Sequence, residues 1–116
     1  MTVTTHLQRT KRSLSPARRR LVELMQSINY GSIANLEVRN GEPVFDPPPH
    51  SARDIYFNKG ANSPHPRLER DDFALKSQIL ELFALFDREG ALTIEILFVQ
   101  DGLPFRLTVA DVARAA

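Results

Sequence analysis

Three histidines and two adjacent aspartates are the residues of this chain with the most evident capacity for chemistry. His6, His50 and His65 are the only histidines, and no two stand four residues apart, the spacing with which a helix holds one metal ion. We therefore expect each to be a solvated loop residue, and we expect no metal ion or other cofactor. Asp71 and Asp72 could act as an acid–base pair, but they are fully explained as the cap of a following helix.

The common signatures of covalent catalysis and of phosphate binding are missing from the sequence. The chain has no cysteine, and none of its serines lies in the Gly-x-Ser-x-Gly pattern of a nucleophile elbow. Its five glycines are spread along the chain and form no glycine-rich loop that would cradle a phosphate. Glu37 and Glu95 fall at strand positions that are expected to face solvent. The sequence therefore predicts a protein that is not an enzyme.

Positive charge is concentrated near the start of the chain. Residues 1–22 hold six of the 15 lysines and arginines and none of the 14 acidic residues. The six basic residues are Arg9, Lys11, Arg12, Arg18, Arg19 and Arg20. Such a cluster can bind a polyanion by neutralising phosphates, with an affinity that falls as salt rises. No aromatic residue is interleaved for base stacking and no nucleic-acid-binding motif is recognised. The alternatives are a solubilising arm and an arm that folds back on its own body or on a neighbouring subunit.

A proline-rich segment followed by aromatic residues suggests a surface for binding another protein. Pro47-Pro48-Pro49 favours an extended polyproline conformation and excludes a helix. Arg53, Tyr56 and Phe57 follow closely, and exposed aromatic and arginine side chains often dominate protein interfaces. This interpretation requires that Tyr56 and Phe57 be exposed in the folded subunit.

Two tight turns organise the fold that must position these residues. Asn40-Gly41 and Asp101-Gly102 each lie between runs of strand-forming residues. A two-residue hairpin loop of the common primed type needs positive φ at both central positions, which Asn or Asp tolerates at the first and Gly adopts freely at the second. The sequence thus predicts one β-hairpin over residues 33–45 and another over residues 92–109. Pro43, directly after the first turn, is typical of an edge strand.

In the second hairpin, the alternation of apolar and polar residues predicts which side chains face the core. The set expected to share that face is Leu92, Ile94, Ile96 and Phe98, with Phe105, Leu107 and Val109 on the returning strand. Leu97 and Val99 interrupt the alternation because they make the second face apolar near the turn. We expect that end of the hairpin to be covered by another element or by a second subunit.

A helical pattern precedes each hairpin. Ser15-Pro16 is a typical helix start, because Ser can cap free N–H groups and Pro fits the first helical position, and this helix is expected to end near Ser27. Its apolar stripe consists of Leu21, Leu24, Met25 and Ile28. The second helix is expected to start after the Asp71-Asp72 cap and to end at Glu89-Gly90. Its apolar face consists of Leu75, Ile79, Leu82, Phe83 and Phe86.

The chain is therefore predicted to contain two helix–hairpin units in a single domain, residues 15–116. Unit one covers residues 15–58 and ends in a short fifth strand over residues 53–58, a loop covers residues 59–70, and unit two covers residues 71–110. Residues 1–14 are expected to form a flexible basic arm. Because each helix and each hairpin has one apolar face, the expected fold is α+β, with one antiparallel sheet and both helices on one face.

The two units also resemble each other in sequence. Residues 21–24 match residues 79–82 at an offset of 58, whereas Gly41 corresponds to Gly102 at an offset of 61. The difference would place three additional residues between the helix and the first strand of unit two. Duplication and independent use of the same turn chemistry both explain the similarity. Since the open face and the edges of such a sheet favour self-pairing, we expect a homodimer.

Length and composition exclude several classes of protein. A chain of 116 residues with 42% hydrophobic residues supports one domain with an ordinary core. No apolar run approaches the roughly 20 residues that cross a bilayer, and the polar, basic first twenty residues match no signal peptide. We therefore expect a soluble, cytoplasmic protein without membrane contact. Its expected partner is another protein, with nucleic acid as the alternative.

The run from Leu21 to Phe45, which includes the link Tyr30-Gly31-Ser32, resembles the small bacterial YezD-like proteins. In both, an amphipathic helix, an aromatic-Gly-Ser link and a hairpin with a glycine turn follow one another. More loosely, the whole chain is similar to short bacterial proteins that carry segments like Gly41 to Pro47 and Gly102 to Arg106. Neither resemblance implies catalytic residues, and this chain departs from the YezD-like pattern in its greater length and its second unit.

Overall fold

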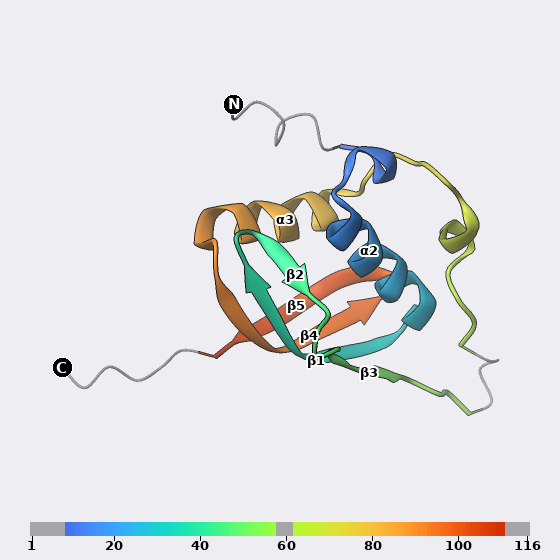
Figure 1. Cartoon of the computed structure of the whole chain (residues 1–116). Helices are drawn as coiled ribbons and strands as arrows, with labels where there is room; N and C mark the ends of the chain where they lie inside the picture. The colour runs from blue at the N-terminus through green and yellow to red at the C-terminus, as the bar shows by residue number, and fades with distance from the viewer. Residues whose placement is uncertain (1–8, 58–61, 111–116) are drawn as a thin grey trace.

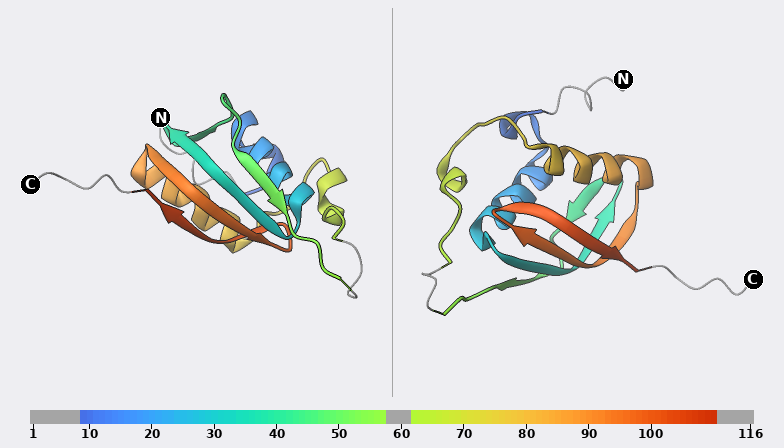
Figure 2. Two further views of the ribbon diagram at one scale, coloured as in Figure 1. Left: turned by 90° about the horizontal axis from the view of Figure 1, so that it is seen from below. Right: turned by 180° about the vertical axis from the view of Figure 1, so that it is seen from behind.

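The computed structural model describes residues 9–57 and 62–110, which form a five-stranded antiparallel sheet and two α-helices (Figure 1). The elements, with η for a 3-10 helix, are η1 (Lys11–Ser13), α2 (Pro16–Ile28), β1 (Gly31–Arg39), β2 (Glu42–Val44), β3 (His50–Arg53), η2 (Pro66–Glu69), α3 (Ser77–Glu89), β4 (Leu92–Gln100) and β5 (Leu103–Val109). The strand order is β2-β1-β4-β5, and β3 also pairs with β1. Both helices pack on one face of the sheet (Figure 2). The predicted α+β fold of two helix–hairpin units is confirmed.

The two turns have the backbone conformation that their sequences predict. Asn40 and Gly41 have φ angles of 53° and 74°, and Asp101 and Gly102 have φ angles of 54° and 70°. Both loops therefore have positive φ at both central residues, as type I′ turns require. The first strands of the two hairpins, β1 and β4, pair at the centre of the sheet, and β2 with its Pro43 lies at an edge.

The two units are related by one constant offset in the numbering. The helices begin at positions 16 and 77, the first strands at 31 and 92, and the second strands at 42 and 103, so the offset is 61 each time. Matched positions are buried in both units. The buried pairs include Leu21/Leu82, Met25/Phe86, Ile33/Ile94, Leu36/Leu97 and Val38/Val99. The structural repeat is therefore continuous from the helix to the second strand of each hairpin.

The predicted match of residues 21–24 with residues 79–82 is wrong. Leu21 corresponds to Leu82 rather than to Ile79, and no residues are added between helix and strand in unit two. The error has a physical origin, because apolar residues recur every three or four positions on a buried helix face. A shift of three residues therefore preserves the apolar pattern, and only the packing distinguishes the two alignments.

Each turn is bonded to the end of the other unit's helix. The Gly41 N–H donates to the Gly90 carbonyl over 2.8 Å, and the Gly102 N–H donates to the Asn29 carbonyl over 2.9 Å. Asn29 and Gly90 are the C-cap residues directly after α2 and α3. Each bond gives a partner to a carbonyl at a helix C-terminus, and the two bonds occupy matched positions in the repeat.

In β1 and β4, the alternation of buried and exposed positions shifts by one residue in the middle of the strand. The buried residues of β4 are Ile94, Leu97 and Val99. Ile96 and Phe98 are only half-buried, so the prediction that they face the core is wrong. The backbone gives the reason: Asn35 in β1 has a φ of 58°, and the β4–β5 register shifts between residues 94 and 96. Such irregularities reverse the alternation of side chains along a strand.

Phe105 on β5 also departs from the prediction, because it is 60% exposed. Phe98 pairs with Arg106 and Val99 pairs with Pro104, which leaves Phe105 as the extra residue of a bulge. The Phe105 side chain therefore lies outside the core, whereas the Leu107 side chain packs against the core.

Two predicted boundaries are wrong. β3 spans residues 50–53 rather than 53–58, because Gly31, the first residue of β1, pairs with Arg53 and leaves the following residues without a strand opposite. Asp71 and Asp72 do not cap α3, which begins at Ser77 after Lys76 without a side-chain cap. Residues 73–75 instead lie against residues 9–11 through a bridge between residues 10 and 74. Residue 58 lies outside the described residues.

We predict that Gly31→Ala releases β3 from the sheet. A Cβ at Gly31 would lie 2.0 Å from the Ala52 carbonyl oxygen and 2.8 Å from the Ile28 side chain, and such overpacking costs about 1–3 kcal/mol. Hydrogen exchange should become faster at the amides of β3 while those of β4 stay protected. Gly90→Ala is the control, because nothing lies within 4 Å of a Cβ at this position, so its effect comes from the φ of 75° and not from overpacking. Unchanged protection of β3 would contradict the prediction.

Candidate interaction surface

The described part of the basic arm is folded onto the domain. The Lys11 N–H donates to the Phe73 carbonyl and the Leu75 N–H donates to the Arg9 carbonyl, each over 2.9 Å, and Leu14 is buried. The prediction of a flexible arm is therefore wrong for residues 9–14, because they pair with a segment from a distant part of the chain. Residues 1–8, with His6, lie outside the described residues.

Lys11 is buried in an ion pair. The residue is 2% exposed, and its Nζ donates to the Arg70 carbonyl over 2.8 Å and lies 2.9 Å from the Glu23 carboxylate. The ammonium also lies 5.6 Å from the centre of the Phe73 ring. A charge that is desolvated and compensated in this way contributes to the fold and is closed to an external polyanion.

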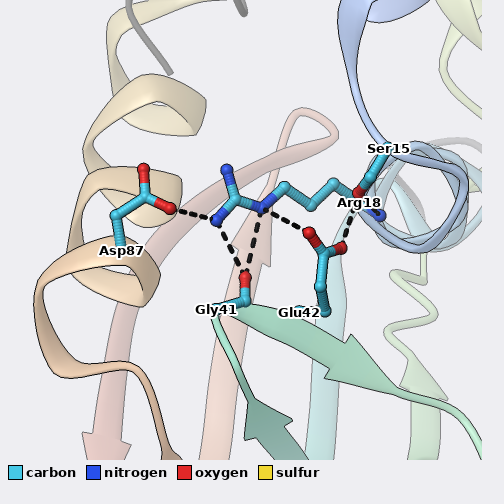
Figure 3. Close-up of polar contacts among 5 residues, drawn as sticks. All are labelled: Ser15, Arg18, Gly41, Glu42 and Asp87. Carbon is cyan, nitrogen blue, oxygen red and sulfur yellow. Dashed lines mark hydrogen bonds and ion pairs between the residues drawn. The ribbon is translucent and has the colours of Figure 1, made fainter. Parts of the chain in front are cut away.

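Arg18 is also buried, and it joins the two units (Figure 3). Its Nη2 donates to Asp87 Oδ1 on α3 over 2.5 Å, and its Nη2 and Nε both donate to the Gly41 carbonyl, over 2.8 and 3.2 Å. Nε lies 3.9 Å from the Glu42 carboxylate, which accepts a hydrogen bond from the Ser15 hydroxyl. We name these five residues the arginine cluster.

The other four basic residues do not form a common binding surface with Lys11 and Arg18. Arg19 donates to backbone carbonyls, including that of Arg12 over 3.1 Å. The Arg20 guanidinium lies 4.4 Å from the centre of the Phe45 ring. Arg9 and Arg12 are exposed. The predicted cluster of six is thus divided between two buried ion pairs and separate surface positions.

The candidate metal and acid–base residues are dispersed. His50 is exposed on β3 and Asp71 is exposed before α3. His65 is half-buried; its Nδ1 accepts from the Arg67 N–H over 3.1 Å and its Nε2 lies 3.4 Å from Asp101. In the part of the chain that the structure describes, no three His, Asp or Glu side chains are grouped so that they could hold a metal ion.

The residues predicted to bind a protein partner are exposed. Tyr56 is 45% exposed and Phe57 is 84% exposed, and Arg53 is exposed at the end of β3. Ile55, which the sequence analysis did not single out, is 64% exposed. Figure 1 shows this segment extending away from the helices. The condition set for the interaction hypothesis is met, and three large apolar side chains are contiguous.

Local contacts hold the base of this segment in place. The Asn62 side-chain amide lies within 3.1 Å of the Ile28, Tyr30 and Asp54 carbonyls. Tyr30 contacts Tyr56 edge-on, with ring centres 6.3 Å apart. Partial desolvation and the Asp54 carboxylate, 3.4 Å from the phenol oxygen, raise the pKa of Tyr56.

β3 presents a free edge beside these side chains. It pairs with β1 on one side, and no strand among residues 9–57 and 62–110 pairs with its other side. All four of its residues are exposed. The unpaired backbone groups of such an edge can accept a further strand.

Comparison of the chain with protein-family models, curated proteins and solved structures gives no match. The resemblance of residues 21–45 to YezD-like proteins therefore stays a prediction. Within the described residues, no helix is both long enough and apolar enough to cross a membrane.

We predict that Asp87→Ala destabilises the fold through Arg18. The variant leaves a buried guanidinium with less compensation, and we expect a loss of about 2 kcal/mol in the free energy of unfolding. This loss is smaller than the roughly 3–5 kcal/mol that follows when one partner of a fully buried ion pair is removed, because the Asp87 side chain is 33% exposed. Urea denaturation measures the loss. Arg88→Ala, whose side chain is 67% exposed, is the control and should stay within about 0.5 kcal/mol; an equal loss there would contradict the prediction.

Asp72 should make stability depend on pH in the acid range. The backbone N–H of Arg12, which donates to the carboxylate over 2.8 Å, lowers the pKa of Asp72. Because the pKa is lower in the folded chain, the ionised carboxylate stabilises the fold above the ordinary value of 3.8, and this contribution is lost as the pH falls through the folded value. Asp72→Asn should therefore melt at a lower temperature than the wild type at neutral pH, and thermal melts should converge in acid. A difference in melting temperature between the two proteins that persists in acid would disprove this prediction.

Proposed function

We propose that this protein is a non-enzymatic interaction module that forms a homodimer through β3 and the apolar segment Ile55–Phe57. The observation that carries the proposal is the exposure of three consecutive large apolar side chains directly after an edge strand. Contiguous apolar surface of this kind marks contact sites, and an edge strand offers backbone hydrogen bonds to an added strand. The module acts in the cytoplasm and needs no cofactor.

A second copy of the chain fits this surface by charge and by symmetry. In antiparallel pairing about a two-fold axis between Arg53 and Asp54, each Arg53 lies opposite Asp54 of the partner subunit. The same register places Tyr56 opposite the partner subunit's Ser51. Because opposite charges across an antiparallel pair are stabilising, the segment is complementary to itself. These features support a homodimer over a partner of different sequence.

The alternative, a nucleic-acid-binding accessory protein that uses the basic arm, has weaker support. Lys11 and Arg18 are buried in ion pairs, so a polyanion could contact only the remaining four basic residues. Neutralisation of phosphates makes the affinity for nucleic acid fall steeply with salt. An affinity that stays constant in filter-binding measurements as salt is raised would therefore remove this alternative.

Replacing Tyr56 and Phe57 by serine should convert the dimer into a monomer, because it removes the apolar contact. Sedimentation equilibrium at tens of micromolar measures the mass. Both side chains are exposed, so the variant should keep the circular dichroism spectrum and melting behaviour of a folded domain. Phe105→Ser is the matched control: Phe105 is 60% exposed on β5, at the opposite edge of the sheet, and its loss should leave the dimer intact.

Charge variants test the register of the dimer. Arg53→Asp or Asp54→Arg alone places like charges opposite each other and should weaken association, whereas the double exchange should restore it. A wild-type chain that sediments as a monomer at every concentration would contradict self-association. Dimerisation that is indifferent to all three variants would contradict the antiparallel pairing.

A further inference from the structure

A cavity of about 140 Å³ in unit two occupies the place that the arginine cluster occupies in unit one. The constant offset between the units relates Ser15, Arg18, Gly41, Glu42 and Asp87 to Lys76, Ile79, Gly102, Leu103 and Gln26 respectively. All five counterparts line this cavity. The same framework of a helix start, a hairpin turn and the neighbouring helix therefore surrounds both sites, and only the side chains differ.

The counterparts lack the charges of the arginine cluster. Ile79 stands where Arg18 extends its guanidinium, and Leu103 stands in place of Glu42. Gln26, in place of Asp87, is 3% exposed, and its Oε1 has no hydrogen-bond partner among the described residues. Buried polar atoms are almost always hydrogen-bonded, so an unpaired one needs an explanation. The cavity thus contains a buried amide whose oxygen has no hydrogen-bond partner among the described residues.

Basic side chains from a different part of the chain complete the cavity. His65 and Arg67, at η2, line it together with Lys76 and Asp101. Asp101 lies 3.4 Å from His65 Nε2 and is 66% exposed, and Lys76 is exposed as well, so solvent screens both of these charges, whereas Arg67 and His65 are half-buried. α3 also begins at the cavity without a side-chain cap, and the free N–H groups of its first turn add positive potential. The electrostatic character of the cavity favours an anion.

We propose that this cavity binds a small free oxyanion of the size of phosphate. Lys76 and Arg67 supply the positive charge, and the Gln26 amide donates from Nε2 once it turns about its terminal torsion, because the two amide atoms are interchangeable in shape. A water molecule takes about 30 Å³, so 140 Å³ admits a tetrahedral oxyanion, whereas typical pockets for organic ligands have about 300 Å³ or more. The oxyanion replaces the negative charge that Glu42 and Asp87 provide in unit one.

The test is a titration of the isotopically labelled protein with inorganic phosphate at constant ionic strength, followed by amide NMR. We expect saturable shifts at the Gly102 amide and at the Gln26 side-chain amide. In the double variant Arg67→Ala/Lys76→Ala the dissociation constant should rise roughly tenfold or more, since charge-assisted bonds dominate oxyanion binding. Arg88→Ala, which changes an exposed arginine away from this cavity, should bind phosphate like the wild type.

Three outcomes would overturn the proposal. The first is the absence of saturation at Gly102 and Gln26, and the second is a double variant that is folded and binds phosphate unchanged. The third is binding of O-phosphoserine without binding of inorganic phosphate, which would assign the cavity to a phosphorylated side chain. The proposal does not rest on dimerisation, so the Tyr56→Ser/Phe57→Ser monomer should bind phosphate as the wild type does.

Discussion

The fold depends on a reciprocal hydrogen-bond constraint between its two units. A primed hairpin turn leaves the N–H of its glycine outside the strand ladder, and in each unit this N–H donates to the carbonyl that ends the other unit's helix. Asn29, Gly41, Gly90 and Gly102 all have positive φ, so each bond joins two residues of positive φ. The two bonds thus connect each turn to the end of the other unit's helix. The central pairing of β1 with β4 then buries both sets of strand residues against α2 and α3.

A shared framework with different side chains accounts for the structural difference between the two units at this position. In unit one the space beside the turn is filled by the Arg18 guanidinium and its carboxylate partners, so that site contributes to stability. In unit two the matched space is a cavity that combines a buried amide with basic groups. Buried ion pairs bring a desolvation cost that must be offset by bonding. In unit one, the carboxylates of the chain itself compensate the buried guanidinium. In unit two, the matched cavity leaves a position for an external ion.

Local rules in the sequence account for the elements, and the errors arise where contacts are distant. The start of α2 at Ser15-Pro16 and both glycine turns follow from the chemistry of adjacent residues, and each was predicted correctly. The burial of Lys11 depends on Glu23 and on residues 70–73, and no pattern near Lys11 indicates it. The same limit applies to the oxyanion cavity, which becomes recognisable only when the packing establishes a single offset between the units.

The exposed apolar segment is a consequence of how the outer edge of unit one is built. In unit two β5 continues for seven residues along β4, whereas in unit one the matching edge of β1 is shared between the three residues of β2 and the four of β3. The three prolines of residues 47–49 lack the N–H groups of a ladder, so the chain leaves β1 after Val44 and returns only at His50. It consequently reaches the end of β1 at Arg53 while Ile55–Phe57 still follow. These side chains are exposed because the strand opposite them has ended, and this exposure is what supports the proposed pairing with a second molecule.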